Sequence, residues 1–325
     1  MTRELDEQLT KYLTDAHSLE QQALAQLRTA PDIAGTPALA AAFREHLGET
    51  EGHERAIRGL LESRGEGTST IKDTVMQLGG KGFVLFARLQ PDTPGKLLAH
   101  ALSFEGLETA SYELLRRVAD RAGAEDVSEQ ATRICAEERE MIATLEGLVD
   151  DALEASLRST ELGELHELIP TYLADAHAIE EQAIGLLERA PKLIDNDQID
   201  EVIAHHLNET REHEELVQAR LTALGGDSSS VKDAAMRLGA LNWSAFFQGH
   251  PDTPGKLVAF AYAFEHLEIG GYLLLRRLAE RADDAETVRL ADTILAQERE
   301  AASALQSVFD AAAAESLRAV GVRGS

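Results

Sequence analysis

Positive charge, cysteine and long apolar runs are all scarce in this chain. Lys and Arg total 31 against 57 Asp and Glu, which gives a formal net charge of −26. Nucleic acids and anionic membranes are bound through clusters of Lys and Arg, so this balance argues against both as partners. The one cysteine, Cys135, has no second thiol for an internal disulfide, and no reactive setting for it is visible.

Targeting and membrane-spanning segments are absent from the sequence as well. No run of 18 apolar residues is present, and a membrane-spanning helix needs a run of about that length. The start, M-T-R-E-L-D-E-Q, lacks the apolar core of a signal peptide. Hydrophobic residues make up 44% of the sequence, as is typical of soluble globular proteins. We therefore expect a cytoplasmic protein without a membrane partner.

What the chain does have is a copy of itself, 160 residues further on. The stretch 43–54, F-R-E-H-L-G-E-T-E-G-H-E, returns at 203–214 as I-A-H-H-L-N-E-T-R-E-H-E, and P-D-T-P-G-K-L occurs unchanged at Pro91 and Pro251. A period this long indicates a duplicated domain, and a length of 325 residues is typical of two domains. We predict domains at 1–157 and 164–318, joined by a linker at 158–163 and followed by a tail at 319–325.

Each copy predicts four long amphipathic helices and no strand. In the first copy they span about 4–30, 36–63, 92–122 and 127–157, with Thr36 as an N-cap before Pro37. Residues 70–90 are apolar but contain three glycines, which predicts short helical pieces in a long connection. The sequence therefore predicts an all-α fold: two ferritin-like four-helix bundles in tandem, each with a long crossover between helices two and three.

Every predicted helix carries acidic residues in its apolar stripe. Several ionised carboxylates in one core would offset most of a domain stability of about 5–15 kcal/mol, and no Lys or Arg lies in the stripes to pair with them. The acids must then be protonated, bound to metal or turned to solvent. They are Glu20, Glu49, Glu105, Glu108 and Glu138 in the first copy and Glu180, Glu209, Glu265, Glu268 and Glu298 in the second.

Histidines accompany these acids on the second helix of each copy. His46, Glu49 and His53 are spaced three and four apart, so they share one helix face. Carboxylate and imidazole ligands suit iron, manganese or zinc. We assign His53 and His213 to the candidate ligands, and we expect His46, His206, Tyr112 and Tyr272 to support the ligands from outside. The alternative is a hydrogen-bonded polar layer that fixes the register of the helices.

Four motifs in order resemble the ferritin-like di-iron carboxylate proteins, most closely the YciE/YciF-type branch. They are D-x-x-x-x-E on helix one, F-x-x-H-L-x-E-T on helix two, E-x-x-E-x-x-x-Y on helix three and E-E-R-E on helix four. The resemblance implies two metal ions per bundle, most often iron. By this resemblance, Glu20 and Glu138 are terminal or bridging ligands. Glu49 and Glu108 are candidates for bridging ligands, and Glu105 and His53 are alternative ligands. The Glu-x-x-His motif of that family is missing, because Gly52 and Met141 stand at the histidine positions.

The resemblance also suggests a function, which is oxidation of ferrous iron by dioxygen or peroxide in a stress-protective role. Two alternatives stay open: a non-enzymatic helical scaffold or interaction protein with a polar core, and a hydrolytic or zinc-holding site. Because the repeat has no gaps, we expect the copies to pack as an intramolecular pseudo-dimer through equivalent faces. Segments 70–90 and 230–250 are predicted to contribute to that contact or to a further subunit of a homo-oligomer.

Overall fold

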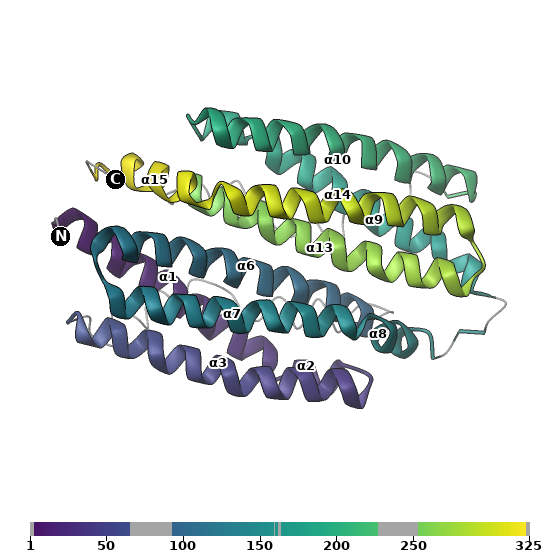
Figure 1. Ribbon diagram of the computed structural model, residues 1–325. Helices are drawn as coiled ribbons and strands as arrows, with labels where there is room; N and C mark the ends of the chain where they lie inside the picture. The colour runs from purple at the N-terminus through teal and green to yellow at the C-terminus, as the bar shows by residue number, and fades with distance from the viewer. Residues whose placement is uncertain (1–2, 66–92, 159, 162–163, 227–252, 323–325) are drawn as a thin grey trace. The chain divides into compact units, whose positions relative to one another are not determined.

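The computed structural model describes residues 3–65, 93–158, 160–161, 164–226 and 253–322, and it confirms the all-α prediction (Figure 1). Helices and no strands occupy these ranges, and they fall into two compact units, Met1–Ser156 with Leu317–Ser325 and Leu157–Ser316. None of the helices described combines the length and the apolar content needed to cross a bilayer. The predicted linker and tail boundaries stay predictions.

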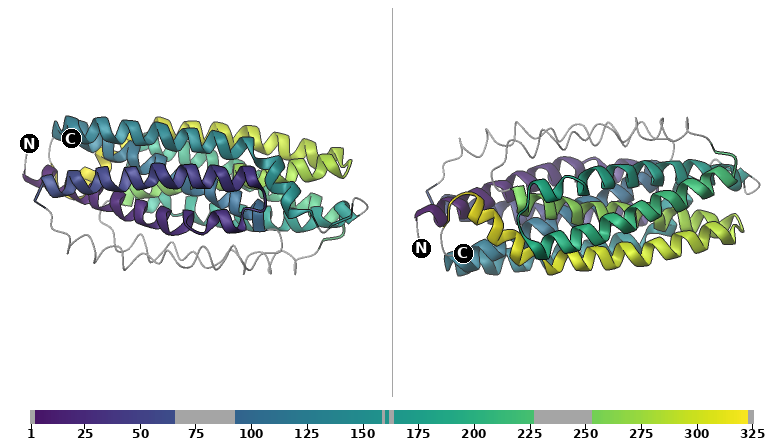
Figure 2. Two further views of the ribbon diagram at one scale, coloured as in Figure 1. Left: turned by 90° about the horizontal axis from the view of Figure 1, so that it is seen from below. Right: turned by 90° about the horizontal axis from the view of Figure 1, so that it is seen from above.

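The first unit is built on four long helices that form a closed bundle. Their order of packing is α1 against α3, α3 against α7, α7 against α6 and α6 back against α1, and the view from below shows α1 and α3 running side by side (Figure 2, left). Apolar positions at helical spacing, such as Leu13, Phe43, Leu102 and Ile134, fill the space between them and are no more than 1% exposed. The elements are α1 (Arg3–Leu27), α2 (Ala30–Ile33), α3 (Pro37–Ser63), α6 (Thr93–Ala122), α7 (Glu125–Gly147) and α8 (Val149–Ser156).

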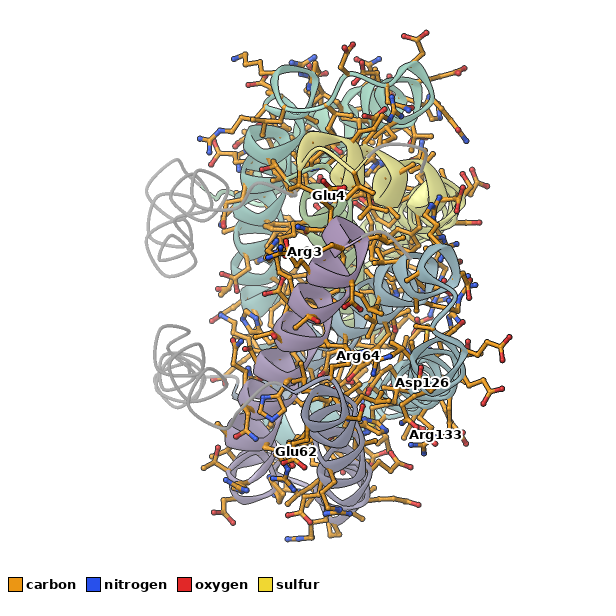
Figure 3. The ribbon with its side chains drawn as sticks, turned by 90° about the vertical axis from the view of Figure 1, so that its left-hand side faces the viewer. Arg3, Glu4, Glu62, Arg64, Asp126 and Arg133 are labelled. Atoms are coloured by element: carbon orange, nitrogen blue, oxygen red, sulfur yellow. The ribbon has the colours of Figure 1, made fainter. Side chains whose placement is uncertain are left out.

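Contacts at the two ends of this bundle establish the direction of each helix. Gly35, just before α3, has a positive φ of 78° and lies so close to Pro94 and Ala155 that a Cβ there would come within 2.8 Å of each. At the opposite end, Arg64 follows α3 and donates to Asp126 in the first turn of α7 at 3.1 Å (Figure 3). Helices α3 and α6 therefore begin at the same end of the bundle and run parallel.

The second unit repeats this arrangement. Its long helices pack in the same cycle, α9 with α10, α10 with α14, α14 with α13 and α13 with α9. The hydroxyl of Ser316 accepts from the amide of Gly255 at 2.7 Å, as Ser156 does from Gly95 in the first unit at 2.9 Å. The elements are α9 (Leu165–Leu187), a 3₁₀ turn η2 (Ala190–Lys192), α10 (Asp197–Ala223), α13 (Thr253–Arg281), α14 (Ala285–Ser307) and α15 (Phe309–Ala319).

The sequence prediction was wrong about the continuity of the fourth helix, which was expected to run unbroken to residue 157. The structure ends α7 at Gly147 and begins α8 at Val149, with the amide of Leu148 bonded to the carbonyl of Leu145 at 3.0 Å. This bond joins residues three apart, so it tightens the last turn of α7. The residue before Leu148 is Gly147, and glycine is a weak helix former. The second unit is interrupted in the same way at Val308.

The first helix also ends earlier than predicted. It stops at Leu27, and residues 30–33 form the separate turn α2. Pro31 explains the break, because a proline inside a continuing helix has no amide to donate and its ring clashes with the preceding turn. The predicted helical pieces at 70–90, and the contact role predicted for 70–90 and 230–250, lie outside the described residues.

A cluster of charged side chains between the last turn of α10 and the first turn of α14 leads to a prediction about stability. Arg220 donates to Asp284 at 2.7 Å, to Glu286 at 2.6 Å and to Thr287 at 2.9 Å, and the side chains of Arg220 and Asp284 are only 11% and 6% exposed. We expect Arg220→Ala to lower the free energy of unfolding by about 3 kcal/mol, because it leaves a buried carboxylate without its cation. The midpoint of urea unfolding measures this loss.

The matched control is Arg64→Ala at the same end of the first bundle. Its partner Asp126 is 56% exposed, so we expect a loss below about 1 kcal/mol. Although burial raises the pKa of Asp284, Arg220 and Thr287 lower it to about 2. The stabilisation from Asp284 is therefore present above pH 3.8 and is lost as the pH falls through about 2. Equal effects of the two alanine variants would contradict this account.

Candidate metal centre

Six polar side chains meet in the middle of the first bundle, and all six are buried. Each sits in the apolar stripe of its helix, so the helical period that buries the leucines carries these groups inward too. None is more than 3% exposed. The six are Glu20 on α1, His46 and His53 on α3, Glu105 and Glu108 on α6, and Glu138 on α7.

These side chains form two clusters that share one carboxylate. Ligand-type atoms of His46, Glu105, Glu108 and Glu138 lie within 4.8 Å of one another, and so do those of Glu20, His53 and Glu138. His46 Nε2 is 3.1 Å from Glu105 and 3.3 Å from Glu138 Oε2. His53 Nδ1 is 3.0 Å from the other oxygen of Glu138 and 3.7 Å from Glu20. One oxygen of Glu138 thus faces each histidine.

The second bundle repeats both clusters with equivalent residues. One contains His206, Glu265, Glu268 and Glu298, and the other contains Glu180, His213 and Glu298. His206 Nε2 is 2.8 Å from Glu265, and His213 Nδ1 is 2.8 Å from Glu298 and 3.8 Å from Glu180. Glu298 is the shared carboxylate here.

Many of the inward-facing atoms make no well-aligned hydrogen bond among the described residues, although the two ring nitrogens lie 3.0–3.3 Å from oxygens of Glu105 and Glu138. In the first bundle these are His46 Nε2, His53 Nδ1, one oxygen each of Glu20 and Glu105, and both oxygens of Glu108 and of Glu138. Buried polar atoms are nearly always hydrogen-bonded, so a group of this size needs a further explanation. Cations among them would satisfy the oxygens and ring nitrogens together. This donor set fits divalent metal ions.

Burial and the neighbouring charges together set the protonation of this centre. Burial raises the pKa of Glu20 to about 8 and that of Glu105 to about 7. Burial also acts to raise the pKa of Glu138, but His46 and His53 hold it well below the ordinary value. For His53, burial acts to lower the pKa, and Glu138 and Glu20 raise it to about 9. Without metal, the centre retains protons near neutral pH, and a bound metal would displace them.

Outer contacts hold several of these side chains from behind. Tyr112 donates its hydroxyl hydrogen to Glu20, and Tyr272 does the same to Glu180. On the side away from the clusters, Nδ1 of His46 lies 2.9 Å from Glu49, and His53 donates from Nε2 to Glu137 at 2.6 Å. Such contacts fix the orientation and tautomer of a metal-binding imidazole.

The structure brings together most of the residues that the sequence assigned to the ligand set, but not Glu49. Its side chain is 44% exposed and lies behind His46, outside both clusters. At about 100° per residue, His53 is only about 20° from His46 around the helix axis, whereas Glu49 is about 60° away from it. The two histidines therefore point inward as a pair. Glu209, the equivalent residue, is 16% exposed and is also outside the clusters.

Glu137 is the contact that sequence reasoning missed. Because Glu137 precedes Glu138, it lies about 100° off the metal-facing stripe, so its position on the helix does not suggest a role at the centre. That rotation turns it toward α3, where it meets the outer nitrogen of His53. The only signal in the sequence was Arg133, four residues earlier, which pairs with Glu137 at 3.1 Å.

The fold and the buried clusters define a class: a ferritin-like four-helix domain with a candidate metal centre, present twice. The comparison with protein families agrees. A family model described as "Domain of unknown function (DUF892)" matches residues 4–158 and 164–318, so the chain belongs to this family and carries its domain in tandem. The family has a ferritin-like fold. No solved structure matches the chain significantly.

Proposed function

We propose that each bundle holds two iron ions and uses them to oxidise ferrous iron with dioxygen or peroxide. The observation that supports two ions rather than one is the shared carboxylate. Glu138 turns one oxygen to each cluster in the first bundle, so this carboxylate would offer one ligand atom to a metal in each cluster. The ligands in our proposal are Glu20, His46, His53, Glu105, Glu108 and Glu138, together with their counterparts in the second bundle.

The charge of this ligand set supports two divalent ions. Four carboxylates carry four negative charges when ionised, and two divalent cations neutralise them in a core with no Lys or Arg among the ligands. Manganese and zinc suit the same donor atoms. We place iron first because the motifs resemble the YciE/YciF-type branch of the di-iron proteins. The stress-protective role is proposed on the same resemblance.

Iron held there supplies a one-electron Fe(II)/Fe(III) couple at each position. With ferrous iron as substrate and peroxide as oxidant, the overall reaction would consume two Fe(II), one peroxide and two protons and give two Fe(III) and two waters. The protein's part is to hold the ions close together, to exclude bulk water and to exchange protons. Burial raises the pKa of Glu20, Glu105 and Glu108, so these carboxyls, together with His53, can hold protons in the metal-free centre.

Elemental analysis and ferrous oxidation test this proposal together. We expect protein purified from iron-supplied cells to carry about four irons per chain, and to consume ferrous iron faster than buffer under dioxygen or peroxide. The matched control is the double variant Glu138→Gln/Glu298→Gln. Metal-free protein without oxidation would favour the scaffold alternative, and bound zinc without oxidation would favour the zinc-holding one.

A further inference from the structure

One difference between the two bundles lies directly behind their metal centres. In the first bundle His53 donates from Nε2 to the carboxylate of Glu137 at 2.6 Å. In the second, Nε2 of His213 lies 3.1 Å from the side-chain oxygen of Gln297, which occupies the equivalent position. Both histidines turn Nδ1 toward the shared carboxylate of their own centre. The two centres therefore have the same inner residues but a different charge one step away.

A second difference accompanies the first. Glu137 also accepts from Arg133 at 3.1 Å, so a chain of charged contacts leads from Arg133, 52% exposed, to His53. The second bundle has Thr293 at the position of Arg133, and its hydroxyl donates to the carbonyl of Arg289 instead. Both members of the charged pair are thus replaced by neutral residues. The exposed pair alone would add only about 0.3–0.5 kcal/mol to helix stability, so its position behind His53 matters more.

The other histidine of each centre follows the same trend. His46 Nδ1 lies 2.9 Å from Glu49, whereas His206 Nδ1 is 4.0 Å from Glu209. Glu209 is instead 3.5 Å from the exposed ring of His205. Both imidazoles of the first centre therefore have a close carboxylate behind them, and neither imidazole of the second does.

The chemistry of these partners predicts how they act on a metal ligand. A carboxylate only accepts hydrogen bonds, so Glu137 keeps the proton on Nε2 of His53 and leaves the Nδ1 lone pair for a metal. Its charge also makes the imidazole a more basic ligand. The amide of Gln297 is neutral, and when turned over it donates from its NH2 group. It therefore fixes the tautomer of His213 less strictly.

We infer that Glu137, held by Arg133, is a positioning residue that makes the first centre the high-affinity one of the two. This inference rests on the proposed function, because it assumes that both centres bind metal. Loss of an outer partner of a metal-binding histidine typically weakens binding about 10- to 100-fold. The first bundle then fills at limiting metal, and the second fills only as the supply rises.

The test uses the full-length chain with one centre disabled at a time. Glu298→Gln removes the shared ligand of the second centre and reports on the first, and Glu138→Gln does the reverse. Co(II) is the probe, with its affinity measured by competition against a chelator and its ligand field by visible absorption. We expect the first centre to bind about 10- to 100-fold more tightly. Adding Glu137→Gln to the first-centre chain should remove this advantage and change the Co(II) spectrum.

The gain-of-affinity variant makes the test independent of folding defects. Thr293→Arg/Gln297→Glu in the second-centre chain rebuilds the charged pair, and we expect Co(II) affinity there to rise toward that of the first centre. For Glu137→Gln in the first-centre chain the control is Glu140→Gln, which removes an exposed charge from the same helix, α7, and should leave affinity and spectrum unchanged. Equal affinities in both centres, or no response to either exchange, would overturn the inference while leaving the proposed function intact. Absence of Co(II) binding at both centres would overturn both.

Discussion

Glu138→Ala is expected to empty both metal positions of the first bundle and to leave those of the second bundle filled. Glu138 is the residue common to both clusters, so its removal takes a ligand from each position. Glu20→Ala should have a smaller effect, because Glu20 belongs to one cluster only. Metal per chain, measured by elemental analysis on purified protein, should fall by about half for Glu138→Ala and to near zero when Glu298→Ala is added.

Glu49→Ala is the comparison that separates the structural ligand set from the one predicted by sequence. The sequence-based hypothesis makes Glu49 a bridging ligand and expects this variant to lose the metal of the first bundle. The structure places Glu49 behind His46, so we expect the metal to stay bound with lower affinity. Glu138→Gln, with circular dichroism to confirm the helical fold, guards against a cavity effect of the alanine. Full metal content in the Glu138→Ala/Glu298→Ala chain would contradict the shared-ligand assignment.

The all-α fold and the tandem bundles could be predicted because several local signals agree. Helical spacing of apolar residues, the N-cap at Thr36, the prolines and the gap-free repeat all indicate the same architecture. The side chain of Thr36 accepts from the amide of Leu39, as an N-cap does. The predictions that failed concern details within this fold, namely where individual helices end. The interruption of the helix at Leu148 depends on a single tightened turn, and no proline in the sequence marks that position.

The candidate centre was predictable in outline but not in its division between inner and outer residues. Acidic and histidine residues in an apolar stripe are visible in the sequence. A difference of about 40° around a helix, such as that between Glu49 and His53, is within the width of a stripe and cannot be resolved from spacing. Packing between helices decides the question, and it pairs His53 with both Glu138 and Glu137.

Metal should stabilise the protein more strongly as the pH rises from about 5 to about 8.5. The reason lies partly in the metal-free state. Burial raises the pKa of Glu20 to about 8 and of Glu105 to about 7, from 4.5 in each case. Stability tied to these carboxyls is fully present below pH 4.5 and is lost as the pH rises through those values, because the unfolded chain then releases protons that the folded chain still holds.

The histidines act mainly in the same direction. Although burial lowers it, the pKa of His53 is raised by Glu138 and Glu20 from 6.5 to about 9, so its contribution too is lost as the pH rises. Burial lowers the pKa of His206, so this residue makes the protein more stable as the pH rises, but only below pH 6.5. In the second bundle, burial raises the pKa of Glu265 to about 8 and that of Glu298 to about 7. Both carboxyls therefore add to the loss of stability as the pH rises.

Metal-free protein should therefore unfold at progressively lower urea concentration between about pH 5 and pH 8.5, whereas metal-loaded protein should not. Each pKa unit corresponds to about 1.4 kcal/mol, and a metal at a hundredfold excess over its dissociation constant adds about 2.7 kcal/mol per site. The difference between the two states should thus reach several kcal/mol at the upper end.

Chelator-treated and Mn(II)-loaded samples at matched ionic strength measure it. Glu20→Gln/Glu105→Gln, which cannot ionise at either position, should show a flatter metal-free profile. If Fe(II), Mn(II) and Zn(II) all left the unfolding of the metal-free protein unchanged across this range, the buried acids would be a hydrogen-bonded polar layer instead of a metal centre.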